Sequence, residues 1–122
     1  QVLLNLLTNA RQAMEETIER HLSVRTYYDA GGERPVVLEV ADTGNGFAQE
    51  DAEKLFTPFY STKQPGQGTG LGLSISLTIV KEHNGTIETT GTPGKGARFV
   101  VRLPAVQRSA DIEEAEVDDR AE

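Results

Sequence analysis

The segment from Gly66 to Ser76, GQGTGLGLSIS, constrains the fold most, because it runs straight into an apolar helical pattern. Glycines at alternate positions give a backbone that can take positive φ and that lets a ligand approach its amide groups closely. A helix is expected to begin where this run ends. Its first N–H groups are unpaired and lie at the positive end of the helix dipole, so the segment predicts a phosphate-binding loop. A plain connecting loop is the alternative.

Two common phosphate-loop motifs do not match. A P-loop needs a glycine, four residues and then Gly-Lys-Ser/Thr, whereas Gly91 to Ala97 (GTPGKGA) has the wrong spacing and no hydroxyl after its lysine. The dinucleotide fingerprint needs a strand directly before its glycines, whereas Tyr60 to Gln67 is polar and contains a proline. The remaining interpretation is a flexible lid, roughly residues 61 to 69, that ends at a helix N-terminus.

Composition limits the class of protein. With 122 residues and 37% apolar content, the chain is expected to form one small domain. It has no cysteine, which fits a reducing compartment and favours a cytoplasmic domain; whether a parent protein is membrane-anchored stays open. Most of the net charge of −7 lies in residues 105–122, which we expect to be a disordered tail or a marginal helix. The domain, residues 1–104, is then nearly neutral, and nucleic-acid binding is not favoured.

The first twenty residues have the pattern of an amphipathic helix, with apolar residues up to Ile18 recurring at intervals of three and four. No N-cap precedes the pattern, so we expect the helix to begin in a longer parent protein. Two asparagines in mid-helix are unusual, because asparagine favours caps and turns, and they suggest contact with a metal or a phosphate. A solvated polar stripe is the alternative. Its members are Asn5, Asn9, Gln12 and Glu16.

The rest of the chain predicts two hairpins and a second helix. Residues 22–28 and 35–41 form one β-rich pair, and residues 86–90 and 97–103 form the other. An apolar helix over residues 71–82 ends at Asn84-Gly85, which is typical of a left-handed C-cap. Two helices with antiparallel hairpins predict an α/β (α+β) two-layer sandwich with the helices on one face of the sheet.

Two further segments carry candidate binding residues. Asp42 stands at a strand end before Thr43-Gly44-Asn45-Gly46, and its carboxylate can accept a hydrogen bond from the amine of adenine while repelling the carbonyl of guanine. An ordinary Asp-Gly turn is the alternative. A short helix is expected from Gln49 to Leu55. The aromatic cluster Phe56 to Tyr60 then suggests an anchor for the lid, within which Lys63 is the lone cation and can reach a phosphate.

These segments together resemble the ordered sequence boxes of sensor histidine kinases. The boxes are NLLTNA from Asn5, DTGNGF from Asp42, FTPFYSTK from Phe56 and GTGLGL from Gly68. Each is weak alone, but their order and spacing over residues 1 to 104 are specific. The chain is similar to the catalytic ATP-binding domain of two-component sensors, with its N-terminal part missing. The resemblance implies the Bergerat fold of the GHKL superfamily, whose sheet is mixed and mainly antiparallel.

The resemblance also implies ATP and Mg²⁺ as ligands and gives each residue a role. Asn9 coordinates the Mg²⁺ that bridges the phosphates, and Asn5 supports the phosphate site from one turn earlier. Asp42 binds the adenine amine in a pocket shaped by Gly44 and Gly46. Phe59 and Tyr60 pack at the lid hinge, and Lys63 contacts phosphate. The lid end and the phosphate-facing helix start comprise Gly68, Gly70, Leu71 and Gly72.

The implied activity is protein histidine kinase activity, in which this domain donates the γ-phosphoryl of ATP to a histidine on a separate dimerisation domain. The expected partners are that domain, in a homodimeric parent, and indirectly a response regulator. Neither His21 nor His83 matches the phosphoacceptor. Two departures, Gln12 and Ala97, stand where many members have a basic residue and a hydroxyl. The alternatives are a degenerate ATP-binding module and a GHKL-type ATPase, although Asn5 occupies the position of the ATPase general-base glutamate.

Overall fold

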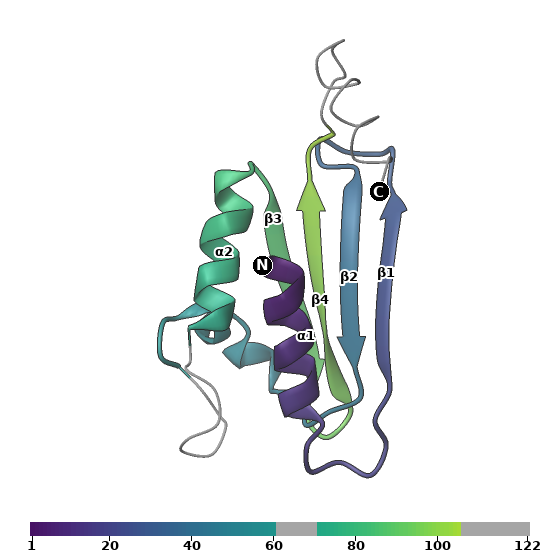
Figure 1. The fold of residues 1–122 in the computed structure, drawn as a ribbon, viewed down its shortest axis with the longest axis vertical. Helices are drawn as coiled ribbons and strands as arrows, with labels where there is room; N and C mark the ends of the chain where they lie inside the picture. Colours follow the sequence, from purple (N-terminus) through teal and green to yellow (C-terminus); the bar gives the residue numbers. More distant parts are fainter. Residues whose placement is uncertain (61–70, 106–122) are drawn as a thin grey trace, which may run out of the picture.

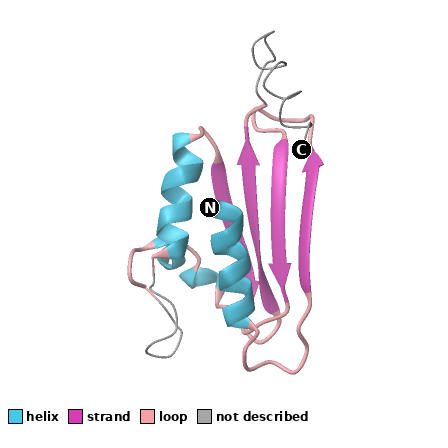
Figure 2. Cartoon of the chain, in the orientation of Figure 1, coloured by secondary structure: helices cyan, strands magenta, loops and turns pink. Residues whose placement is uncertain are grey.

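The computed structural model describes residues 1–60 and 71–105. In chain order its elements are α1 (Val2–Ala13), β1 (Leu22–Tyr28), β2 (Val36–Asp42), the 3₁₀ turns η1 (Gln49–Asp51) and η2 (Glu53–Phe56), α2 (Gly72–Glu82), β3 (Thr86–Thr92) and β4 (Gly96–Leu103). Both helices lie on one face of a four-stranded sheet, as Figure 1 shows and Figure 2 confirms by element type. The predicted two-layer α/β sandwich is confirmed.

The sheet order is β1-β2-β4-β3, and all three neighbouring pairs among the described strands are antiparallel. The resemblance implied a mixed sheet, and the described strands contain no parallel pair. The register places Asp42, at the end of β2, between Leu22 of β1 and Ala97 of β4. Because successive side chains of a strand alternate between faces, Asp42 shares the helix-covered face with Val40.

The core lies between the helices and the two central strands. Leu6 and Ala10 of α1 pack there against Val40, Phe99 and Val101, and α2 contributes Val80. Phe56 packs against it, with its ring edge-on to Phe99 at a centroid distance of 6.3 Å. Most of the apolar residues predicted at intervals of three and four therefore pack in or against this core along the first three turns of α1, whereas Leu3 is 41% exposed.

One helix boundary was predicted wrongly. The pattern indicated a helix to about Arg20, but α1 ends at Ala13, and Ile18 is fully exposed. Beyond the helix end, side chains donate to backbone carbonyls that would otherwise accept from a helical N–H. Thr17 Oγ1 donates to the Met14 carbonyl over 3.1 Å, and Arg20 Nη2 donates to the Glu15 carbonyl over 2.7 Å. The short helix predicted over residues 49–55 is instead the two 3₁₀ turns.

The other helix ends as predicted. Asn84 has a φ of 60°, so this residue is the left-handed one at the end of α2. Its N–H donates to the Lys81 carbonyl over 3.0 Å, and the Gly85 N–H donates to the Val80 carbonyl over 2.9 Å. These two bonds are those of a Schellman motif, which satisfies the last carbonyls of a helix before the chain turns into β3.

Candidate functional site

The loop after β2 is held on three sides. The Asn45 N–H donates to the Ala13 carbonyl over 2.9 Å, and the Asn45 carbonyl accepts from the Gly94 N–H over 2.7 Å. The loop therefore joins the C-terminal end of α1 to the turn between β3 and β4. The Thr43 N–H also donates to the His21 carbonyl over 3.2 Å, which adds the connection before β1.

Gly44 and Gly46 are glycines because the loop is so tightly enclosed. A Cβ at Gly44 would lie 2.4 Å from the carbonyl oxygen of Ala13. Gly46 has a φ of +65°, which disfavours other residues, and its Cβ would lie 2.1 Å from the carbonyl oxygen of Thr92. At both positions the nearest atoms belong to the protein's own backbone, and the base pocket that the resemblance implies beside these glycines stays a prediction.

Asp42 is a buried carboxylate, with 7% of its surface exposed. Its Oδ1 accepts from the Gly44 N–H over 2.8 Å, and the Ala97 N–H is a second backbone donor to the carboxylate. Burial raises the pKa of Asp42 above its ordinary value, and the two N–H groups oppose that rise only in part. No ion pair reaches Asp42 among the described residues. Such a group gains from a ligand that donates a hydrogen bond to it.

A shallow cavity of about 240 Å³ adjoins Asp42 at the end of the β2–β4 ladder. Its lining includes Ala97 and the cationic side chains of Lys95 and Arg98. Ala97 stands where the resemblance implies a hydroxyl in many members, and here that position supplies its backbone N–H to Asp42.

The other end of α1 is bonded to the start of α2. Asn5 Nδ2 donates to the Gly72 carbonyl over 3.2 Å and to Ser76 Oγ over 3.1 Å. Leu71 occupies the N-cap position, so the glycine-rich run does feed a helix start as predicted. Among the described residues, a Cβ at Gly72 would meet nothing closer than 3.9 Å, the Cβ and Cγ of Asn5. Space is therefore left beside the first residue of this helix.

One face of α1 connects these two ends. Asn5, Asn9 and Ala13 are spaced by four residues, so they follow one another along the same side of the helix over roughly 12 Å. Asn5 contacts the start of α2, Ala13 contacts the Asp42 loop, and the half-buried Asn9 lies between them. We call this face the α1 strip, meaning residues 5, 9 and 13. It runs from the helix N-terminus expected to hold phosphate to the carboxylate expected to hold a base.

The other predicted site residues are less closely joined. Phe59 is 75% exposed and has a φ of 66°, whereas Phe56 of the same aromatic cluster packs against the core. The lid lies outside the described residues, so packing of Phe59 at its hinge stays a prediction. Tyr60 is half-buried at the end of the described segment. Three predicted residues, Lys63, Gly68 and Gly70, lie outside the described residues.

Sequence reasoning missed three residues that build the site. Ala13 supplies the carbonyl that holds the Asp42 loop, and Ser76 accepts from Asn5. The side-chain amide of Gln49 hydrogen-bonds the backbone of β3 twice: Nε2 donates to the Thr89 carbonyl over 3.2 Å, and Oε1 accepts from the Gly91 N–H over 3.0 Å. Only Ser76 left a signal in the sequence, as a polar residue on the apolar face of α2, four positions after Gly72.

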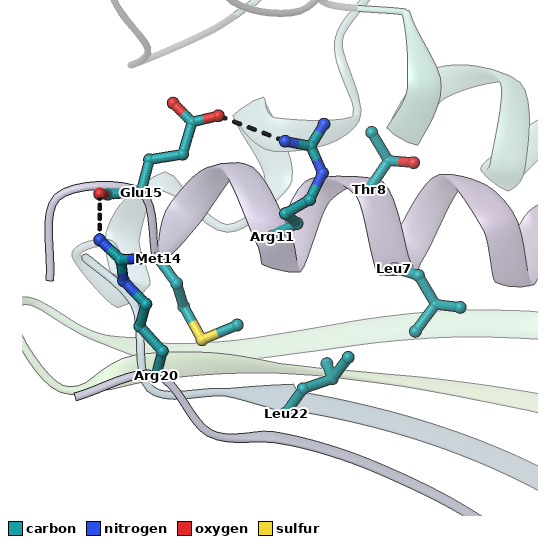
Figure 3. Close-up of a pocket in the computed structure, with 7 residues that line it drawn as sticks. All are labelled: Leu7, Thr8, Arg11, Met14, Glu15, Arg20 and Leu22. Carbon is teal, nitrogen blue, oxygen red and sulfur yellow. Dashed lines mark hydrogen bonds and ion pairs between the residues drawn. The ribbon is translucent and has the colours of Figure 1, made fainter. Parts of the chain in front are cut away.

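A second cavity, of about 580 Å³, lies between α1, the connection that follows it and the start of β1 (Figure 3). Its floor is apolar, with Leu7, Met14 and Leu22. An ion pair between Arg11 and Glu15, 3.5 Å long, lies at its rim. None of the predicted site residues lines it.

The fold matches solved catalytic domains of histidine kinases. The catalytic domain of histidine kinase ThkA has a TM-score of 0.68 at 35% identity, covering 85% of this chain and 64% of that one. The full-length kinase ShkA, solved in complex with AMPPNP, has a TM-score of 0.74 at 30% identity, covering 89% of this chain and 22% of that one. The described layers are thus those of the Bergerat fold.

Sequence comparison agrees. Residues 1–107 match the family of histidine kinase-, DNA gyrase B- and HSP90-like ATPases, and the chain belongs to this family. It is 40% identical to sensor kinase CckA of Brucella abortus over 98% of this chain, and 39% identical to sensor histidine kinase ZraS of Salmonella typhimurium over 91% of it. The chain spans only 13% and 23% of the lengths of these two relatives.

No helix in the described part of the chain is both long and apolar enough to cross a membrane. The same residues contain no group of three or more histidine, cysteine or acidic side chains placed to hold a metal ion.

Proposed function

We propose that this chain is the ATP-binding, phosphoryl-donating domain of a two-component sensor histidine kinase. The α1 strip carries the proposal: it joins a buried carboxylate at one end to the glycine-started helix α2 at the other. In the proposed pose the adenine amine donates to Asp42, and the phosphates lie near Asn9 and the first N–H groups of α2. The alternative base guanine presents a carbonyl oxygen to the same carboxylate and is repelled.

Mg²⁺ fits the donor chemistry of the strip. The amide oxygen of Asn9 is the kind of ligand that Mg²⁺ accepts, and this ion commonly binds through one or two protein groups together with substrate phosphates. We therefore assign Asn9 as the residue that would hold the metal, which would neutralise phosphate charge when bound. The protein's own contribution is to fix the base and the phosphates at the two ends of α1, which orients the γ-phosphoryl group.

The proposed reaction transfers that group to an imidazole on another domain. The nitrogen lone pair forms a bond to the γ-phosphorus, the bond from that phosphorus to the bridging oxygen breaks, and ADP leaves. We do not propose His83 as the acceptor, because the resemblance implies an acceptor on another domain; one of its ring nitrogens, Nδ1, already contacts the Ile79 carbonyl over 2.8 Å. We propose that the acceptor belongs to a dimerisation domain of a homodimeric parent kinase, which then serves a response regulator in the cytoplasm.

A hydrolytic ATPase is the less favoured alternative. An ATPase of this superfamily needs a carboxylate base to activate water, and the corresponding position holds Asn5. Both N–H groups of that amide are directed to Gly72 and Ser76 of α2. A carboxamide is too weak a base to take a proton from water, which supports transfer to a partner over hydrolysis.

Calorimetry with ATP and GTP in the presence and absence of Mg²⁺ tests the nucleotide assignment, with Asp42→Asn as the variant. We expect Mg²⁺-dependent, ATP-selective binding that the variant loses. A folded native chain that binds neither nucleotide contradicts the proposal. Addition of a separately purified histidine-containing dimerisation domain then tests transfer. Phosphate on that domain supports kinase function, whereas ATP binding without transfer favours the degenerate module.

A further inference from the structure

Ser76 is a polar residue in an apolar environment. It belongs to the core-facing side of α2 and is completely buried, with 0% of its surface exposed. The neighbouring hydroxyls of this helix bond within the helix: Ser74 Oγ donates to the Leu71 carbonyl, and Thr78 Oγ1 donates to the Ser74 carbonyl. Ser76 differs because it accepts a hydrogen bond from another element, the Asn5 amide of α1. A buried hydroxyl is costly unless it is bonded, so this contact accounts for its place in the core.

The Gly72 carbonyl fixes which way the Asn5 amide points, because a carbonyl only accepts, whereas a serine hydroxyl can bond either end of an amide. A carboxamide has two N–H donors on its nitrogen, and here one is directed to the Gly72 carbonyl at 3.2 Å and the other to Ser76 Oγ at 3.1 Å. A flipped amide would set its oxygen against the Gly72 carbonyl, which is acceptor against acceptor. The nitrogen therefore faces α2, and the oxygen faces the other way, where it accepts from Gln1 Nε2 over 2.9 Å.

We propose that Ser76 is a positioning residue for nucleotide binding, and that it acts through Asn5. This inference rests on the proposed function and adds to it. Asn5 and Ser76 together hold the first turn of α2 at a set distance from α1, and so hold the phosphate-facing N–H groups in place relative to Asn9. In this arrangement Asn5 acts through the two N–H groups of its nitrogen, which bond α2.

Substitutions at Ser76, Asn5 and Thr78 in the 122-residue chain separate this role from a merely structural one. Ser76→Ala removes the acceptor, and Asn5→Asp keeps an oxygen while removing both N–H donors. Thr78→Ala is the matched control, because it deletes a hydroxyl of the same helix whose bond is local and exposed. Ser76→Cys, which keeps the size of the side chain but is a weak acceptor, replaces Ser76→Ala if that variant does not fold.

Affinity for ATP with Mg²⁺ is measured by calorimetry at a temperature where urea titration shows each variant to be folded. We expect Ser76→Ala to weaken binding about fivefold, the factor for one lost hydrogen bond, and Thr78→Ala to change nothing. In the Asn5→Ala background the Ser76→Ala change should add no further loss, because Ser76 acts through that amide. Asn5→Asp should bind at least as weakly as Ser76→Ala.

Three outcomes would contradict the expected results, and each points to a different conclusion. Native affinity in folded Ser76→Ala, or an equal further loss in the Asn5→Ala background, overturns the role of Ser76. Binding by Asn5→Asp that is as tight as the native chain, or tighter, identifies Asn5 as a metal ligand and overturns the pair. A folded native chain that binds no ATP contradicts the proposed function itself, and is recognised before any variant is compared.

Discussion

The backbone N–H of Asn45 donates to the carbonyl oxygen of Ala13 over 2.9 Å, so the loop after β2 is bonded directly to the last residue of α1. The final carbonyls of a helix have no partner within it, and here one of them serves as a fixed acceptor for the loop. Gly44 lies against the same carbonyl. The position of Asp42 relative to α1 therefore depends on where this helix ends.

Gly44→Ala should destabilise the domain. Its Cβ would lie 2.4 Å from the Ala13 oxygen and 2.6 Å from the Ala13 carbonyl carbon, both backbone atoms that cannot rotate away. We expect a loss of about 1–3 kcal/mol in the free energy of unfolding, measured by urea titration. Gly32→Ala is the control, since a Cβ there meets nothing within 4 Å. Equal stability of the two variants would mean that the loop does not press on the helix end.

Gly72→Ala should have the reverse effect, sparing stability and impairing binding. Within the described part of the chain a Cβ there meets only Asn5 atoms, at 3.9 Å, and alanine is the better helix former, so stability should be unchanged or higher by up to about 1 kcal/mol. A phosphate that approaches this amide would be obstructed, and ATP affinity should fall about tenfold or more. Native affinity in calorimetry would show that no ligand comes close to Gly72.

The stability of Asp42→Asn relative to the native chain should increase as the pH rises. Burial raises the pKa of Asp42, so the folded state holds this proton more tightly than the unfolded chain does. Between the ordinary and the raised pKa, the contribution of Asp42 to the free energy of unfolding therefore falls with increasing pH. Asparagine removes that dependence. Urea titrations from acidic to neutral pH should show the stability of the variant relative to the native chain increasing; a constant difference would contradict a raised pKa.

Glu39→Gln should affect stability slightly and binding not at all. Glu39 lies on the face of the sheet opposite the helices, where its carboxylate is 3.5 Å from Arg25 Nη1 and 4.0 Å from Arg98 Nε. Both arginines are more than half exposed, so we expect a loss of about 1 kcal/mol or less that shrinks at high salt. Calorimetry should give native ATP affinity. A binding defect in a folded variant would contradict the proposed site, because it would mean that the face opposite the helices takes part in nucleotide binding.

Local chemistry made much of the fold predictable. The strand over residues 22–28 was predicted to the residue, and the end of α2 followed from Asn84, a residue that accepts positive φ. The closeness of Asn5 to Gly72 was only implied by resemblance, because 67 positions separate them and no periodicity relates them. Ala13 and Gln49 could not be predicted for a related reason. Ala13 acts through its backbone carbonyl and Gln49 through its side-chain amide, and the partners of both lie far away in the chain.

The clearest failure of periodicity, Ile18, provides the last prediction. Its spacing from Met14 fits an apolar stripe. However, the Ala13 carbonyl accepts from the Asn45 N–H, and α1 ends at Ala13, so Ile18 lies outside the helix and does not reach the core. Ile18→Ala should therefore change the free energy of unfolding by no more than about 0.5 kcal/mol. Leu6→Ala, a truncation of a fully buried core residue, should cost about 2–5 kcal/mol in the same urea titration. If the two truncations lower the free energy of unfolding by similar amounts, α1 must extend beyond Ala13 in solution. The Asn45 N–H could then not bond the Ala13 carbonyl, and Asp42 would be positioned in another way.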